Sequence, residues 1–332
     1  MLPFLRATRS KALHWVNHCR LHSVAATLRS DGRLPVFVIA SPLDMHLAPL
    51  AVRHGHPRIA HVIAGNGLSP GDVEWIRGGA PGTPVVRLKA SFQGNPSTFL
   101  SHAEVVRLCE EASRGDFCIQ DADCFVTDPA WWNELCFESG AEYAVAPFRK
   151  PIHQLGGWMP ETYLVRINKQ GYCRRQAYGV HPDITTDPKP LGDRLRAQGV
   201  REPYFPDTAK AYFDTLQKHW LAAFLDGEQF RVVPGADTIV HHIGGSSYLT
   251  GRQVPDVSHW GYWPLNTIYF HLRILEFPQF ARFRPRFGHL YESYGSAERI
   301  LAKYPDFRQS QRFARSEKIL GMFNDLLRTL SS

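Results

Sequence analysis

The chain has 332 residues, of which 44% are hydrophobic and 21% charged, and its formal net charge is +7. This composition is that of an ordinary globular protein, and the length allows one large domain or one domain with an appendage. No apolar run of roughly 18 residues occurs, so we expect no membrane-spanning segment. The amino terminus lacks the continuous apolar core of a signal peptide.

The six cysteines show no Cys-x-x-Cys spacing, and Cys118 and Cys124 lie in an apolar strand region. We predict that the cysteines are small buried residues in a reducing compartment. A zinc site or a disulfide framework is not expected from this pattern.

The positive charge is concentrated at the two ends. Residues 1–33 carry six Lys or Arg against one acid, and residues 260–332 carry eleven against six, which leaves the middle acidic. An acidic centre argues against a nucleic-acid groove, so we expect no nucleic-acid partner. Basic ends that also carry aromatic residues fit peripheral contact with an anionic membrane, and a solvated basic face fits them equally well. The expected location is cytoplasmic, with such contact at the inner face of the membrane.

The first 120 residues are expected to alternate between strands and helices. In chain order we predict an amphipathic helix over 7–28, a strand over 34–40, a helical stretch over 47–54, a strand over 59–64, a helix over 72–77, a strand over 84–88, a helix capped by Ser97 or Ser101 that ends near 114, and a strand over 117–120. This alternation indicates an α/β fold whose mostly parallel, Rossmann-like sheet is flanked by helices. Ligands bind beyond the carboxyl ends of such strands. Polar side chains at these ends are expected to converge on one crevice, and they are Ser41, Asp44, Asn66, Asp121 and Asp123.

Residues 115–128 read GDFCIQDADCFVTD and join an apolar strand to two carboxylates. Asp121 and Asp123 are two positions apart, so on an extended backbone their side chains point to the same side. Two acids at the end of a buried strand are costly unless a positive charge lies between them. A hard dication, Mn²⁺ or Mg²⁺, would supply that charge. Turn or helix-cap roles are the alternative for this pair.

Two common nucleotide motifs are absent from the sequence. No Gly-x-Gly-x-x-Gly follows the first predicted strand, which argues against a dinucleotide oxidoreductase. No Gly-x-x-x-x-Gly-Lys-Ser/Thr loop occurs, which argues against the common NTPases.

The second half of the chain contains fewer clear strands and longer connections. We predict a helix starting at Pro129, a strand over 141–147, a flexible loop over 150–160, a strand over 163–167, an irregular loop over 178–206, a helix over 208–225, an aromatic cluster over 259–263, a basic aromatic stretch over 281–287, and helices over 265–277, 297–304 and 313–330.

Residues 240–248 read VHHIGGSSY and place two histidines before a Gly-Gly-Ser-Ser run. Together with the Asp121-x-Asp123 pair, this segment resembles the GT-A class of nucleotide-sugar glycosyltransferases, most closely the family 2-like members. The resemblance covers roughly residues 34–249 and is clearest at these two motifs. It implies that Asp121, Asp123 and His242 hold a divalent metal against the donor pyrophosphate, with His241 as the second choice.

The same resemblance implies further site residues. The donor site would be formed by Ser41, Asp44, Asn66, Asp121, Ala122, Asp123, Gly244, Ser246 and Ser247. In the family an acidic residue that contacts the nucleotide base often occupies the position of Asn66. Because this chain has Asn there, neither that contact nor the identity of the base follows from the resemblance. Asp214, in a Tyr-Phe-Asp-Thr segment, would be the acceptor-side carboxylate and Asp207 the runner-up, although helix capping explains either acid equally well. Trp158 could stack on an acceptor sugar, and packing is the alternative.

The resemblance implies three regions and an activity. Residues 1–33 would be an N-terminal helix, 34–250 a GT-A domain with a nucleotide-binding half (34–128) and an acceptor half (129–250), and 251–332 a helical extension. The expected activity is metal-dependent, inverting transfer of a sugar, from a UDP-sugar by preference, to a carbohydrate or lipid-linked hydroxyl in polysaccharide biosynthesis. A nucleotidyltransferase is the first alternative, but the first strand lacks the Gly-rich basic loop typical of that class. An inactive carbohydrate- or membrane-binding protein is the second, and the intact acidic pair and histidine count against it. Oligomeric state is not readable from the sequence.

Overall fold

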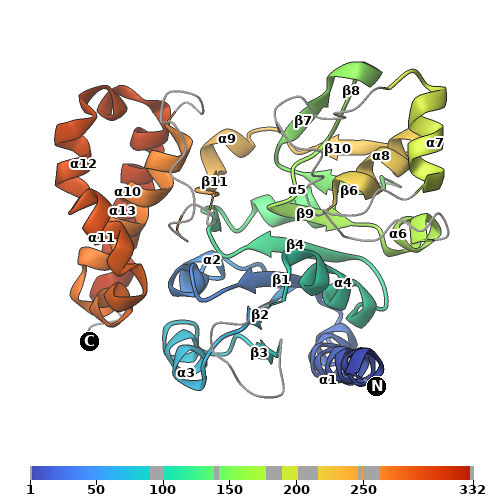
Figure 1. Ribbon diagram of the computed structural model, residues 1–332, viewed down its shortest axis with the longest axis horizontal. Helices are drawn as coiled ribbons and strands as arrows, with labels where there is room; N and C mark the ends of the chain where they lie inside the picture. Colours follow the sequence, from blue (N-terminus) through green and yellow to red (C-terminus); the bar gives the residue numbers. More distant parts are fainter. Residues whose placement is uncertain are drawn as a thin grey trace.

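Seven strands of the described chain form its central sheet (Figure 1). The computed structural model describes residues 2–89, 100–137, 142–176, 189–200, 216–245, 249 and 262–329. In chain order the strands are β1 (Leu34–Ala40), β2 (Ile59–Asn66), β3 (Val85–Leu88), β4 (Phe117–Asp121), β6 (Ala144–Ala146), β9 (Leu164–Ile167) and β10 (Phe230–Val232). In space their order is β10-β6-β9-β4-β1-β2-β3.

The sheet is mostly parallel, as predicted. β1 pairs in parallel with β2 and β4, β2 with β3, and β10 with β6, whereas β9 runs antiparallel to both of its neighbours. The chain leaves β1 toward β2 and β3 and returns on the other side of β1 as β4. The carboxyl ends of β1 and β4 therefore flank a topological switch point, where open α/β sheets bind their ligands.

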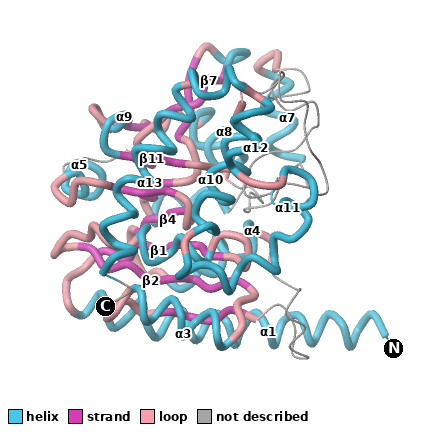
Figure 2. The backbone as a smooth tube through the Cα atoms, turned by 90° about the vertical axis from the view of Figure 1, so that its left-hand side faces the viewer, coloured by secondary structure: helices cyan, strands magenta, loops and turns pink. Residues whose placement is uncertain are grey.

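Helices α1 (Leu2–Ser30) and α4 (His102–Ala112) cover one face of the sheet. The buried positions of α1 include Leu21, Ala25 and Leu28, which recur every three or four residues and pack in the same apolar cluster as Phe37 of β1. The helix is longer than predicted at both ends. Figure 2 shows its amino-terminal end projecting beyond the rest of the chain.

α1 also covers the open edge of β3. The side-chain amide of Asn17 donates to the carbonyl of Lys89 at 2.8 Å and accepts from the Lys89 amide at 3.0 Å. Arg20 donates to the carbonyl of Arg87 at 3.1 Å. An exposed edge strand can pair with a strand of another chain. Here the side chains of α1 instead form hydrogen bonds with the outward-facing backbone groups of that edge.

The opposite face of the sheet packs on helices from both ends of the sequence. They are α2 (Ala48–Ala51), α3 (Pro70–Gly79), α10 (Trp263–Glu276), α11 (Gly288–Tyr294), α12 (Ala297–Lys303) and α13 (Gln311–Thr329). Residues of these helices form one apolar cluster with Val38 and Ala40 of β1. The C-terminal helices stand together beside the sheet, with β11 (Val240–His242) between them and the strands (Figure 1).

The basic aromatic stretch belongs to this core. Phe280, Phe283 and Phe287 are buried in a 3₁₀ segment, Pro278–Phe287, and Arg286 pairs with Asp72 of α3. These rings are therefore not presented to a membrane surface. Among the described residues, no helix has the length and apolar character needed to span a bilayer.

Two predicted loops contain regular structure, and both predictions are wrong at those positions. Residues predicted as a flexible loop form a hairpin of β7 (Arg149–Ile152) and β8 (Gly157–Pro160), because Gly156 adopts φ +65° and lets the chain reverse. Part of the predicted irregular loop is α7 (Lys189–Ala197), in which Leu191 and Leu195 are buried one turn apart. Pro190 is tolerated there because it lies in the first helical turn.

The remaining helices differ from prediction mainly at their ends. α5 (Trp131–Cys136) begins after Pro129, because Asp128 accepts a hydrogen bond from the Ala130 amide and holds a turn first. α6 (Lys169–Gln176) was not predicted. α8 (Gln217–Leu225) is the described part of the helix predicted over 208–225, and residues 259–261 of the aromatic cluster lie outside the described residues. Four of the six cysteines are buried, whereas Cys19 and Cys173 are exposed.

Candidate functional site

A small two-stranded sheet brings His242 to the acidic pair. β5 (Cys124–Val126) pairs antiparallel with β11, and the register sets His242 opposite Cys124. The pairing continues past the strand, because the Ile243 amide donates to the Asp123 carbonyl at 3.1 Å. Segments more than a hundred residues apart are thus fixed in register, and the imidazole lies beside the two carboxylates.

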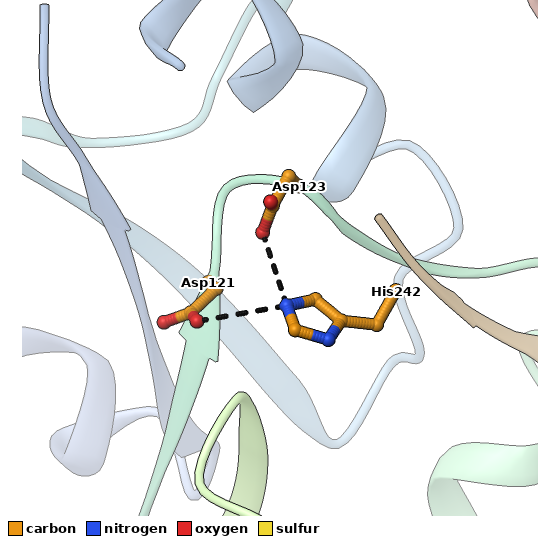
Figure 3. A group of neighbouring side chains, drawn as sticks. All are labelled: Asp121, Asp123 and His242. Carbon is orange, nitrogen blue, oxygen red and sulfur yellow. Dashed lines mark ion pairs between the residues drawn. The ribbon is translucent and has the colours of Figure 1, made fainter. Parts of the chain in front are cut away.

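Asp121, Asp123 and His242 form one compact group (Figure 3). Nε2 of His242 lies 3.4 Å from Oδ1 of Asp123 and 3.9 Å from Oδ2 of Asp121. One ligand atom from each residue lies within 4.8 Å of the others. The structure therefore brings together the three residues predicted as metal ligands.

The acids are fixed by backbone contacts at the switch point of the sheet. Asp121 ends β4, and its amide donates to the carbonyl of Tyr163 at 2.8 Å. Ala122 is fully buried, and its amide donates to the carbonyl of Ile39 in β1 at 3.2 Å. The turn that carries both carboxylates is therefore anchored to the strands on either side of β4.

Asp123 is buried and has two defined partners. Its Oδ2 accepts from the Gly244 amide at 2.9 Å, while Oδ1 faces His242. Burial acts to raise the pKa of Asp123, but the charge and hydrogen bond of His242, helped by His271 and the Gly244 amide, outweigh it and lower the pKa. Asp123 is therefore an anion in this site.

The acids favour the protonated form of His242. Burial acts to lower its pKa, and the charges of Asp123 and Asp121 with the Asp123 hydrogen bond overcome this and raise it. The ring of Tyr163 stacks on the imidazole with centroids 3.8 Å apart and planes 17° apart. The stack and the β11 register together define where the ring nitrogen points.

The donor set suits a hard divalent cation. Two carboxylates and one imidazole match the ligand preferences of Mn²⁺, and the carboxylates alone match those of Mg²⁺. Asp123 is only 3% exposed, so its charge needs a positive partner inside the protein. An imidazolium provides that partner when no ion is bound, and binding an ion requires His242 to release its proton.

A third carboxylate lies close to this group. Burial, followed by the charge of Asp123, raises the pKa of Asp44 from 3.8 to about 7. Oδ1 of Asp44 accepts from the amide and hydroxyl of Ser41 at 2.6 and 3.0 Å. Ser41 and Asp44, both predicted to contact the donor, thus close the loop after β1 through their own hydrogen bonds. Their contact with a nucleotide stays a prediction.

Gly244 forms the other wall of the group. Its φ is +69°, and a Cβ added there would lie 2.8 Å from Cε1 of His242. Its carbonyl accepts from Thr267 Oγ1 at 2.7 Å, and Trp263 Nε1 donates to the Ile243 carbonyl at 3.1 Å. The first turns of α10 therefore fix the loop that follows His242.

The predicted donor residue Asn66 is engaged elsewhere in the fold. Its side chain is 3% exposed, accepts from the Leu100 amide at 2.8 Å and donates to the Leu100 carbonyl at 2.9 Å. These bonds tie the end of β2 to the chain entering α4. A base contact by Asn66 stays a prediction.

Several predicted residues do not join the group. His241 points to the other side of β11, where burial followed by the charges of Lys318 and Arg315 lowers its pKa to about 4. Trp158 of β8 packs near Phe230, with ring centroids 5.9 Å apart, and its acceptor role is untested. Four predicted site residues lie outside the described part of the chain, namely Asp207, Asp214, Ser246 and Ser247.

Sequence reasoning missed three residues that touch the group. Tyr163 stacks on His242, Thr267 holds Gly244, and His102 of α4 places Nε2 3.3 Å from Oδ1 of Asp121. A lone tyrosine, threonine or histidine carries no pattern that separates it from core or surface residues. Only the spatial arrangement identifies these three.

No protein-family model and no curated protein matches the chain. Among solved structures it is similar to galactosyltransferase LgtC in complex with donor and acceptor sugar analogues (13% identity, TM-score 0.35, 60% of this chain and 73% of that one). It is also similar to glycosyltransferase GlyE of Streptococcus pneumoniae TIGR4 (12%, 0.38, 74% and 65%). A third is the bifunctional glycosyltransferase WbbM (11%, 0.39, 77% and 52%), of which the chain spans about half the length. Likeness at these levels carries no argument about this chain, so function is inferred from the site.

Proposed function

We propose that the protein is a metal-dependent glycosyltransferase of the GT-A type that moves a sugar from a nucleotide-sugar to a hydroxyl acceptor. The observation that carries the proposal is the Asp121, Asp123 and His242 group at the switch point of a mostly parallel sheet. Its two acids and one imidazole are the donor set expected around a dication that binds a diphosphate. We favour a UDP-sugar as donor, inversion at the transferred carbon, and a carbohydrate or lipid-linked acceptor in polysaccharide biosynthesis.

In this proposal the residues around the cation have separate roles. Asp121, Asp123 and His242 hold Mn²⁺ or Mg²⁺, and the Gly244 amide fixes the orientation of the Asp123 carboxylate. A bound dication neutralises the charge that grows on the leaving nucleoside diphosphate. The proton of the acceptor hydroxyl passes to a carboxylate, which we assign to Asp214 with Asp207 as the alternative.

The direct test removes one ligand without changing its shape. Asp123→Asn should abolish nucleotide release from NDP-sugars and lower Mn²⁺ affinity, because the amide carries no charge. Asp128→Asn is the matched control, since Asp128 follows in the same segment with an exposed side chain. Wild-type turnover by Asp123→Asn, with the fold intact by circular dichroism, would reject the site.

A donor panel separates this proposal from its alternatives. Nucleoside diphosphate released from an NDP-sugar in the presence of Mn²⁺, and suppressed by EDTA, supports a glycosyltransferase. Pyrophosphate released from an NTP and a sugar phosphate would indicate a nucleotidyltransferase. Neither product with any donor would indicate a binding protein.

For location we propose the cytoplasm, with peripheral contact at the inner face of the membrane through α1. Trp15 is 66% exposed on this helix, one turn after the exposed Lys11. Aromatic and basic side chains together bind anionic interfaces. Flotation with anionic liposomes should carry the wild type upward and leave Trp15→Ser behind. Equal flotation of the two proteins, or none of the wild type, would contradict the contact.

A further inference from the structure

The two oxygens of Asp121 face two different imidazoles. Nε2 of His102 lies 3.3 Å from Oδ1, and Nε2 of His242 lies 3.9 Å from Oδ2. The rings approach from separate elements, His242 from β11 and His102 from the first residue of α4. Both nitrogens lie at ion-pair distance from the carboxylate, and the His102 contact does not have hydrogen-bond geometry.

Asp121 differs from Asp123 in how firmly its side chain is held. Asp123 is nearly buried and accepts from the Gly244 backbone amide. The side chain of Asp121 is 30% exposed, and its Oδ1 faces His102, whose side chain is 38% exposed. Attraction between two groups this exposed contributes little to stability, so the consequence of the contact is geometric.

His102 is placed by a rigid local structure. Ser101 caps α4, accepting from the Glu104 amide at 3.2 Å, while the Glu104 carboxylate accepts from the Ser101 amide at 3.0 Å. Immediately before the cap, Leu100 is bound at both its amide and its carbonyl by the buried Asn66. The end of β2 thus fixes the start of α4, and with it the Cα of His102.

We propose that His102 is a positioning residue of the metal site, which holds Oδ1 of Asp121 and leaves Oδ2 turned toward His242 and the cation. This inference rests on the proposed function only in taking Asp121 as a metal ligand. The physical basis is that a carboxylate fixed beforehand loses less rotational freedom when it coordinates. Residues that orient metal ligands typically change metal affinity by about 10- to 100-fold when removed.

The test compares metal affinity in three variants of the full chain. His102→Ala removes the contact and should weaken Mn²⁺ binding, measured by calorimetry and by electron paramagnetic resonance of free Mn²⁺, by about tenfold or more. His102→Gln places a polar N–H group of similar reach beside Oδ1 and should recover most of the loss. His14→Ala is the matched control, because Nε2 of His14 on α1 lies 2.6 Å from the carboxylate of Glu111 on α4, outside the site.

Each outcome decides the inference. The inference is supported if His102→Ala loses Mn²⁺ affinity, His102→Gln recovers it, and the control variant binds Mn²⁺ as the wild type does. Unchanged affinity in His102→Ala overturns it, and so does a loss that His102→Gln does not recover. Thermal unfolding of all variants shows whether the fold is retained. The proposed function is tested separately, with the wild-type protein. It is rejected if the wild type binds Mn²⁺ but releases no nucleotide from any NDP-sugar.

Discussion

The aromatic ring of Tyr163 lies flat on the imidazole of His242, with ring centroids 3.8 Å apart. The backbone carbonyl of Tyr163 also accepts a hydrogen bond from the amide of Asp121 at 2.8 Å. Tyr163 therefore contacts two of the three candidate ligands, one through its side chain and one through its main chain. A substitution can change the first contact and leave the second in place, which separates ring packing from strand pairing.

We expect Tyr163→Phe to bind Mn²⁺ as the wild type does, because the stacked ring is retained. Tyr163→Leu should lose about tenfold in affinity, since the imidazole is then free to rotate away from the carboxylates. Calorimetric titration with Mn²⁺ at one pH measures both. A loss in Tyr163→Phe as large as in Tyr163→Leu would mean that the hydroxyl, not the stack, matters.

Gly244 gives a second prediction, for which the chain offers a close control. Gly244→Ala places a Cβ 2.8 Å from Cε1 of His242 in a residue with φ +69°. Gly235 has φ +71° and no atom within 4 Å of an added Cβ. Each alanine should cost about 1 kcal/mol of unfolding free energy from the left-handed backbone. Gly244→Ala should cost more than Gly235→Ala, because its Cβ would also lie 3.1 Å from the ring of Trp263.

The two glycine variants should differ in their effect on the candidate metal site. Gly244→Ala should lower Mn²⁺ affinity and turnover, because the ring of His242 must move, while Gly235→Ala should leave both unchanged. Urea unfolding measures the stability cost of each variant, and Mn²⁺ titration measures the difference in metal affinity. Equal metal affinity in the two variants would show that the His242 ring has room to shift.

The candidate ligand group could be predicted, its two acids from a local pattern and its histidine from the resemblance to the GT-A class. An apolar strand that ends in Asp121 and Asp123 indicates where the acids lie, and a histidine before glycines indicates a loop that closely approaches a ligand. The choice of His242 over His241 matches the register of β11 on β5, in which neighbouring side chains point to opposite faces.

The residues that support the ligands could not be predicted, because their roles arise from contacts between distant elements. His102 reaches Asp121 only because Asn66 fixes the start of α4. The β7–β8 hairpin was missed because its sequence is rich in glycine and proline, which local rules read as a loop. Its pairing depends instead on Gly156 and on Gly157, where an added Cβ would lie 2.4 Å from the ring of Phe224.

Asp44 predicts a dependence of stability on pH. Burial, then the charge of Asp123, raises the pKa of this carboxyl from 3.8 to about 7 in the folded protein, against the opposing Ser41 hydrogen bonds. Between these values the unfolded chain binds fewer protons than the folded one, so stability falls as pH rises. Asp44→Asn keeps the Oδ1 acceptor and does not titrate, so it should be more stable than the wild type above pH 7.

The advantage of Asp44→Asn should grow from about pH 4 to about pH 7 and then level off, reaching at most about 4 kcal/mol. Urea unfolding in EDTA at several pH values measures it, and the exposed Asp128→Asn is the control. Adding Mn²⁺ should shrink the difference, because a nearby dication favours the ionised form of Asp44. A difference that does not vary with pH would contradict the raised pKa.

The last prediction concerns Asn66, whose two hydrogen bonds to Leu100 set the start of α4. Asn66→Ala should cost about 2 kcal/mol of unfolding free energy, about 1 for each lost bond. It should also weaken Mn²⁺ binding, because His102 then loses its fixed position beside Asp121. If Asn66 affects Mn²⁺ binding only through the contact of His102 with Asp121, the double variant Asn66→Ala/His102→Ala should bind Mn²⁺ no more weakly than His102→Ala alone.

Asn17→Ala is a matched control for this cycle. Asn17 is also buried and binds both backbone groups of a single residue, Lys89, at 2.8 and 3.0 Å, but it lies on α1 at the sheet edge. Its loss should reduce stability by a similar amount and leave Mn²⁺ affinity unchanged. Additive losses of affinity in the double variant would show that Asn66 affects the site by a route that does not include His102.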